Sequence, residues 1–300
     1  MPNEPENLTG GYLLEYEYRD ALTDEKSGFV TDSGVSLILH SPKHATQGEI
    51  DYIADLYGEL EEALLSEDGV NKQGKHFSDY LDMDSFIDGL LLYDFTANQD
   101  KGFTSWYLYL PQDSQTFYMG PLWDFDQSME TPDQPPDSVN VSAQARYGNS
   151  HQIGSYQEQS FIELFFSHRE FIDRMTERFD GFKEVLADSL NEKTAALFEE
   201  IRASAAMDGV RWGYTVNQKK DVELQDFVNE RIETLTAIYG DMDAYIDEAV
   251  QTLERNGLPG ERAPKGGHTA VYISAAAAAL VIAVFMFVIM KRKRRQEKSR

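Results

Sequence analysis

The sequence predicts an α+β protein that carries one membrane-spanning helix near its C-terminus. Two runs rich in β-branched and aromatic residues, TSWYLYL and QTFYMGPL, flank the turn-forming residues PQDSQ, which is typical of a β-hairpin. Apolar residues recur at helical spacing in several segments between residues 46 and 239. Residues 271–290 carry no charge and are long enough to cross about 30 Å of hydrocarbon.

The composition excludes several classes of protein. Of the 300 residues, 41% are hydrophobic and 12% are aromatic, which is sufficient for a buried core, and none is cysteine, which excludes disulfides and thiolate metal sites. The net charge is −25, and the last ten residues carry seven basic and one acidic side chain, so the other 290 carry about −31. This charge argues against nucleic-acid binding; it fits either basic protein partners or simple solubility.

The N-terminal part of the chain predicts strands and one amphipathic helix. Residues 1–9 are polar and are expected to be disordered. Residues 12–18 and 35–40 are predicted strands. Residues 46–66 are a predicted helix, because Thr46-Gln-Gly-Glu49 is a capping-box pattern and apolar residues follow at helical spacing. Acidic residues on its other face are expected to be solvated: Glu59, Glu61 and Glu62.

The central stretch, residues 84–126, joins a helix to two clusters of acidic and amide residues. The helix is predicted to begin after an N-cap at Asp82 or Asp84 and to end near Asn98. The predicted hairpin lies between the two clusters: Asn98 and Asp100 before it, Asp124 and Asp126 after it. Because a hairpin returns the chain to its starting point, the two clusters should meet in space.

A helix, an Asn/Asp loop, a hairpin and a further Asp also follow one another in the larger lobe of protein kinases. Phosphoryl transfer needs hard oxygen ligands for Mg²⁺ and a separate carboxylate near the attacking hydroxyl. Asp and Asn are also ordinary residues of surface turns, so the order of parts alone leaves plain turns as the alternative.

The motifs themselves resemble the CotH kinase family, the spore coat protein H-like proteins. The similar segments are Asp84-Ser85-Phe86-Ile87-Asp88, Asn98-Gln99-Asp100, Ser105-Trp106-Tyr107-Leu108-Tyr109 and Gly120-Pro121-Leu122-Trp123-Asp124-Phe125-Asp126. The upstream run GGYLLE, residues 10–15, also looks like a family segment, so the resemblance covers about residues 8–245. Leu110 departs from the family, which often places Lys there.

The resemblance implies a protein-kinase-like larger lobe that uses ATP and Mg²⁺. Carried onto this sequence, it makes Asp100 the expected catalytic carboxylate. It places nucleotide-bound Mg²⁺ at Asn98 and Asp124. Asp126 would be a second carboxylate ligand, or would contact the ligands without binding the ion itself. Trp123 and Phe125 would pack and orient the turn.

The resemblance also implies that the smaller, nucleotide-covering lobe has no counterpart before Gly10. We therefore expect further residues, including an export signal, upstream of Met1. In this interpretation residues 10–245 form a partial kinase-like domain.

The C-terminal part predicts a long loop, several helices and an anchor. Residues 131–154 are rich in Pro and polar residues and are a predicted loop that includes the glycosylation pattern Asn140-Val-Ser142. Helices are predicted at 161–168, 171–186, 194–206 and 222–239, with Trp212 and Tyr214 as core or hinge residues. A stalk (246–270), a transmembrane helix (271–290) and a basic cytoplasmic tail (291–300) complete the chain, and the positive-inside rule places the domain outside the cell.

The sequence therefore predicts a membrane-anchored, surface-exposed CotH-like kinase that phosphorylates Ser or Thr of secreted or surface proteins, with basic or Ser-rich substrates. The first alternative is a catalytically inactive surface protein that keeps the scaffold for binding. The second, a hydrolase with a carboxylate pair, lacks any marked acid and base among the residues.

Overall fold

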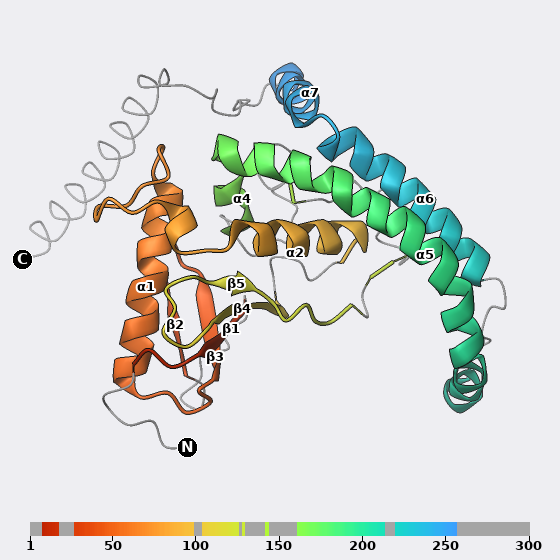
Figure 1. Ribbon diagram of the computed structural model, residues 1–300, viewed down its shortest axis with the longest axis horizontal. Helices are drawn as coiled ribbons and strands as arrows, with labels where there is room; N and C mark the ends of the chain where they lie inside the picture. Colours follow the sequence, from red (N-terminus) through yellow and green to blue (C-terminus); the bar gives the residue numbers. More distant parts are fainter. Residues whose placement is uncertain are drawn as a thin grey trace, which may run out of the picture. The chain divides into compact units, whose positions relative to one another are not determined.

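An antiparallel sheet of five strands forms the first half of the fold (Figure 1). The computed structural model describes residues 8–17, 27–98, 104–125, 128–129, 142–143, 161–213 and 220–256. In this part of the chain the strands are β1 (Tyr12–Tyr16), β2 (Gly28–Val30), β3 (Ser36–Ser41), β4 (Trp106–Leu110) and β5 (Tyr118–Met119), in the order β2-β3-β1-β4-β5. The predicted hairpin is confirmed as β4–β5, with Leu108 opposite Met119.

Strand β1 joins the hairpin to the N-terminal strands, because it pairs with β3 on one side and with β4 on the other. Its alternate residues Tyr12, Leu14 and Tyr16 are buried, and so are the residues of β4 that lie opposite Leu14 and Tyr16. The opposite face of the two strands carries polar residues such as Glu15 and Tyr107, which are paired in register. The sheet therefore has one face in the core and one face of polar character.

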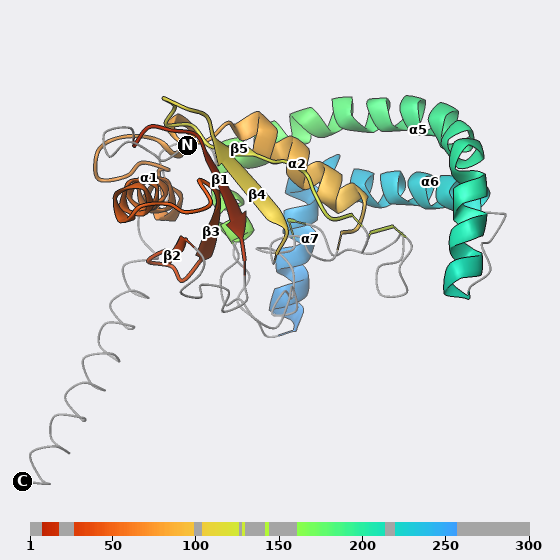
Figure 2. The same ribbon diagram turned by 90° about the horizontal axis from the view of Figure 1, so that it is seen from below.

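Helix α1 (Gln47–Leu65) packs beside the sheet (Figures 1 and 2) and begins at the predicted capping box. The Thr46 backbone N–H donates to Glu49 Oε2 over 2.7 Å, and Glu49 N–H donates to Thr46 Oγ1 over 3.3 Å. The expectation that its acidic face is solvated is wrong for Glu61, which is only 2% exposed. The Thr31 hydroxyl donates to Glu61 Oε1 over 2.7 Å, so this carboxylate joins the turn after β2 to α1.

Helix α2 (Met83–Phe95) follows a short 3₁₀ turn, η1 (Phe77–Asp79), and lies between the sheet and the C-terminal helices (Figure 1). Its N-cap is Asp82, the first of the two predicted positions, and it ends three residues before Asn98. A Cβ at Gly89 would lie 2.2 Å from the Met119 sulfur, so the Met119 side chain would have to move if this glycine were replaced. Helix α2 is therefore tightly packed against the hairpin.

The C-terminal helices are α4 (Phe161–Phe165), α5 (Arg169–Trp212), α6 (Lys220–Tyr239) and α7 (Met242–Arg255). The prediction of separate helices at 171–186 and 194–206 is wrong, because α5 runs without a break through the polar residues between them, where no Pro or Gly stands. It ends at Gly213, which has a φ of 76° and forms a left-handed cap.

Two further expectations for this region also differ from the structure. Trp212 is 66% exposed, so it is not one of the core residues, and Tyr214 lies outside the described ranges. Helix α7 includes residues 246–255, for which the sequence predicts the start of the stalk, and it buries Ile246 and Val250. None of the helices in the described ranges is long and apolar enough to cross a membrane; the predicted span at 271–290 lies outside those ranges.

Candidate active site

The hairpin brings the loop after α2 into contact with the loop after β5. The Asn98 side-chain nitrogen donates to the Asp124 carbonyl oxygen over 2.8 Å and to Ser128 Oγ over 2.9 Å. The Met129 N–H donates to the Thr96 carbonyl oxygen over 2.8 Å. The prediction that the two polar clusters meet is therefore confirmed for Asn98 and Asp124; Asp100 and Asp126 lie outside the described residues.

Asp124 is held in an uncommon backbone conformation. Its φ is +63°, and that of Ser105, at the start of β4, is +57°. Left-handed conformations cost free energy at residues other than Gly, although Asp tolerates them better than most. The Ser105 hydroxyl donates to Asp124 Oδ2 over 3.1 Å, so the two turns jointly orient one half-buried carboxylate.

An aromatic contact fixes the loop that carries Asp124. The Phe125 ring stacks on Tyr93 of α2 with centroids 5.1 Å apart, as expected for a residue that orients the turn. The Tyr93 hydroxyl donates to the Trp123 carbonyl oxygen over 3.4 Å. The same expectation is wrong for the Trp123 side chain, which is 60% exposed.

A buried polar network fixes the end of α2, from which Asn98 follows. The Arg231 guanidinium of α6 donates to the Asp94 carbonyl oxygen from Nε (2.9 Å) and Nη2 (2.5 Å). The Asp94 carboxylate accepts from the Ser142 backbone N–H (3.0 Å), the Ser142 hydroxyl (2.9 Å) and the Tyr239 hydroxyl (2.6 Å). Burial, followed by the charge of Asp94, raises the pKa of Tyr239 well above its ordinary value.

Sequence reasoning missed Asp94 and Arg231. The available signal was one charged residue inside the apolar run LLLYDF and another among the apolar positions of α6. Ser142 shows that the predicted loop at 131–154 is joined to α2 at this point.

Carboxylates gather on the polar face of the sheet beside Asp124. The Glu17 side chain is 8% exposed and accepts from the Thr104 hydroxyl over 3.1 Å, and Glu15 Oε2 lies 2.6 Å from His40 Nε2. Burial and the nearby Glu15, with smaller contributions from Asp124 and Glu17, raise the pKa of Tyr107 to about 12. Among the residues that the structure describes, the surroundings of Asp124 are therefore negative and suited to cations.

In the described part of the chain this place offers two of the three expected metal ligands, and Mg²⁺ that is bound to a nucleotide takes its other ligands from phosphates and water. Among the described residues, no three His, Asp or Glu side chains lie close enough together to hold one. Of the predicted metal ligands Asn98, Asp124 and Asp126, the structure brings the first two together.

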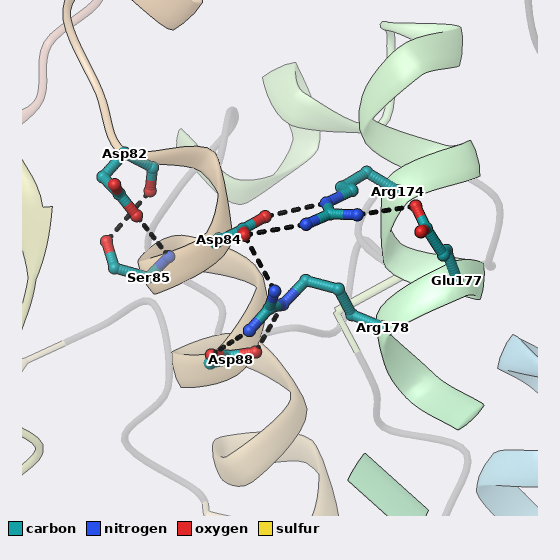
Figure 3. Close-up of polar contacts among 7 residues, drawn as sticks. All are labelled: Asp82, Asp84, Ser85, Asp88, Arg174, Glu177 and Arg178. Carbon is teal, nitrogen blue, oxygen red and sulfur yellow. Dashed lines mark hydrogen bonds and ion pairs between the residues drawn. The ribbon is translucent and has the colours of Figure 1, made fainter. Parts of the chain in front are cut away.

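The motif Asp84-Ser85-Phe86-Ile87-Asp88 has a structural use, which Figure 3 shows. Arg174 of α5 binds both oxygens of Asp84, each over 2.8 Å. Arg178, one turn later, binds both oxygens of Asp88 over 2.7 and 2.6 Å and also donates to Asp84 over 2.8 Å. The hydrogen bond from Arg174 holds the pKa of Asp84 below its ordinary value.

Ser85, in the middle of this motif, connects α2 to the hairpin. Its backbone N–H donates to Asp82 Oδ1 over 2.8 Å, and its hydroxyl oxygen accepts from the Met119 N–H over 3.2 Å. The motif therefore braces α2 against both α5 and β5, and it stands behind the site rather than in it.

Three comparisons with known proteins were informative to different degrees, and the match to a family model agrees with the motifs. Neither a search of curated proteins nor a search of solved structures gave a match. The family model described as CotH kinase protein matches residues 3–235, a range that includes α2, the hairpin and both polar clusters. The resemblance drawn from the sequence is confirmed, and the chain belongs to the CotH kinase protein family.

Proposed function

We propose that this chain includes the larger lobe of a protein kinase, which transfers the γ-phosphoryl group of ATP to Ser or Thr of a protein substrate. The observation that supports this most directly is the contact between Asn98 and Asp124, which are 26 residues apart in the chain and are joined across the base of one hairpin. Family membership supports a kinase-like activity of this kind.

The donor atoms at this place suit Mg²⁺ bound to ATP. Mg²⁺ prefers carboxylate and amide oxygens, and an Asn side chain can offer its oxygen while its nitrogen donates elsewhere. Asp124 and Asn98 would hold the ion, with Asp126 beside them. When bound, Mg-ATP would supply the phosphoryl group, and its Mg²⁺ would neutralise part of the negative charge of the phosphates.

The residues of the chain itself would position and activate the substrate. In the proposal, Asp100 accepts the proton of the attacking hydroxyl. Ser105 orients the Asp124 carboxylate, and the stack of Tyr93 on Phe125 keeps the loop in place. The negative surroundings of the site favour a hydroxyl that is flanked by basic residues.

We further propose that the protein is anchored in the cell membrane by residues 271–290, with the domain outside and residues 291–300 inside. The proposal rests on the uncharged run and the five basic residues, Lys291–Arg295, that follow it. The substrates would then be secreted or surface proteins.

The test compares two Asp→Asn substitutions in one hairpin of the full-length protein. Asp124→Asn removes a carboxylate at the site, whereas Asp113→Asn removes one at the hairpin tip, where φ is also positive (59°). We expect Asp124→Asn to lower metal-dependent phosphoryl transfer by about a hundredfold or more, with an unchanged melting temperature. Asp113→Asn should keep the activity. Equal activity of the two variants would refute the assignment.

The alternative of an inactive binding scaffold fits one observation, because Asn98 and Phe125 already serve to hold the two loops together. Calorimetric titration of the full-length protein with Mg-ATP separates the two functions. Heat of binding that Asp124→Asn abolishes supports the kinase, and the absence of binding by the wild type supports the scaffold.

A further inference from the structure

A groove between β2 and α1 has no part in the proposed phosphoryl transfer. Its volume is about 600 Å³, and it is lined by residues 29–32, by one side of α1 from Ala54 to Leu65, and by Gln73. Strand β2 is at one edge of the sheet, and the β4–β5 hairpin that carries the candidate site is at the other (Figures 1 and 2). The groove and the candidate site are therefore separate surfaces.

The lining of the groove is strongly acidic. Among the residues that the structure describes, no basic side chain lines it, and five of the lining residues carry carboxylates: Asp32, Asp55, Glu59, Glu61 and Glu62. Three of these have partners within the fold, since Glu61 accepts from Thr31, Glu59 accepts from Tyr80, and Glu62 pairs with Lys72. Asp32 and Asp55 are exposed, and within the described ranges Asp55 forms no hydrogen bond or ion pair. The pKa of Lys72 is raised first by Glu62 and to a smaller extent by Asp32, so Asp32 also interacts electrostatically with Lys72.

The same groove also presents apolar surface. Val30 is 56% exposed and Leu65 is 52% exposed, and both belong to the lining together with the half-buried Phe29. Exposed apolar side chains beside exposed carboxylates in one groove fit a peptide-binding surface. The sign of the charge selects a basic partner.

A metal ion is a poorer occupant than a peptide. In the described part of the chain, no three of the acidic side chains lie close enough together to hold one ion. Carboxylates that are distributed along a groove match instead a chain segment that carries several separate positive charges.

We propose that this groove docks a cationic segment of a protein partner, one that carries several Lys or Arg residues and one or two apolar side chains. The identification of this partner with the kinase substrate rests on the proposed function. The binding itself does not, because the groove lies apart from the site and needs no nucleotide.

The test measures the binding of a fluorescein-labelled peptide, KRLKRVK, to the full chain by fluorescence anisotropy without ATP. The groove variant is Asp32→Asn/Asp55→Asn, and the control is Glu233→Gln/Glu248→Gln, which removes two exposed carboxylates from α6 and α7. The two variants have the same net charge. We expect the groove variant to raise Kd about five- to tenfold and the control to leave it nearly unchanged.

Replacing the apolar residues of the probe, as in KRSKRSK, should weaken binding to the wild type as well. Equal affinities of wild type, groove variant and control, at matched melting temperatures, would overturn the proposal, because they would show attraction to the acidic surface as a whole. Asp124→Asn should keep peptide binding while it loses transfer. A variant that loses phosphoryl transfer but keeps peptide binding, or that loses peptide binding but keeps phosphoryl transfer, therefore tells the two proposals apart.

Discussion

Asp94 is fully buried, and the hydrogen bonds around it explain how α2 tolerates it. A carboxylate without partners in an apolar interior costs several kcal/mol, and this cost is offset only where its oxygens accept enough hydrogen bonds. Ser142 and Tyr239 donate to the carboxylate, and Arg231 donates to the carbonyl oxygen of the same residue. Asp94 therefore joins three segments that are far apart in the sequence directly behind the Asn98 loop.

We expect Asp94→Ala to lower the free energy of unfolding by about 3–5 kcal/mol, because it leaves the hydroxyls of Ser142 and Tyr239 buried without an acceptor. Ser142→Ala removes one donor and should cost only about 1–2 kcal/mol. Urea denaturation followed by circular dichroism measures both values. Similar small losses for the two variants would show that water replaces the carboxylate and that the network does not hold the fold together.

Single residues also show where sequence patterns succeed and where they fail. The contact of Asn98 with Asp124 could be predicted, because the hairpin between them brings its two ends together. The burial of Glu61 could not, because its partner Thr31 lies on another element and the helical pattern alone gives an acidic residue a solvated position. The left-handed Ser105, which orients Asp124, has no signature in the sequence.

At the scale of elements, α2 and α5 are joined by the charge network of Figure 3. Asp84 and Asp88 stand one turn apart on α2, and Arg174 and Arg178 stand one turn apart on α5, so each guanidinium can bind one carboxylate through two hydrogen bonds. The side chains are partly exposed, with Asp84 at 42% and Asp88 at 51%, and solvent screening limits what each pair contributes.

We expect Asp84→Asn/Asp88→Asn to lower the melting temperature by about 2–4 °C at pH 7. Asp180→Asn, which removes an exposed ion pair with Lys183 within α5, is the control and should change it by less than about 1 °C. Equal shifts in the two variants would mean that the network between the helices adds nothing beyond ordinary surface charge.

The same network predicts a pH dependence. The pKa of Asp84 is lowered in the folded state, mainly by the hydrogen bond from Arg174, so the ionised carboxylate stabilises the fold above the ordinary pKa of Asp, about 4. This stabilisation is lost as the pH falls through the lower, folded-state pKa. The difference in melting temperature between wild type and Asp84→Asn/Asp88→Asn should therefore shrink below about pH 4. If the difference in melting temperature stayed constant down to pH 2, it would not come from the ionised Asp84 carboxylate.

Helices were predictable in position more often than in extent. The start of α1 and most of α6 agree with the predictions, because capping and apolar spacing are local signals. The sequence predicts two helices over the range of α5, which is one helix of 44 residues, because the polar segment near its middle lacks an apolar face. A long helix continues through such a segment where nothing interrupts its backbone hydrogen bonds.

At the scale of the whole molecule, the α+β class and the family followed from the sequence, but the arrangement of the sheet did not. The sequence predicts the β4–β5 hairpin and the strands near β1 and β3 separately. The hairpin and the N-terminal strands form one sheet only because β1 pairs with β4, about 90 residues later in the chain. Side-chain alternation does not specify such a partner. This pairing places Glu15 and Glu17 beside Asp124 and gives the candidate site its negative surroundings.

The proposed topology of the whole chain is the last prediction. Each charged residue at the centre of a bilayer would cost about 2.5–3.5 kcal/mol, and residues 271–290 contain none. The five basic residues after Met290 favour the cytoplasmic leaflet by about 1 kcal/mol each, whereas the acidic part of the chain has the opposite preference. Protease added to intact cells should therefore cut near residues 257–267 and release the domain, leaving a fragment with the basic tail protected inside. A domain that is cleaved only after lysis would place it in the cytoplasm, and its substrates would then be cytoplasmic proteins.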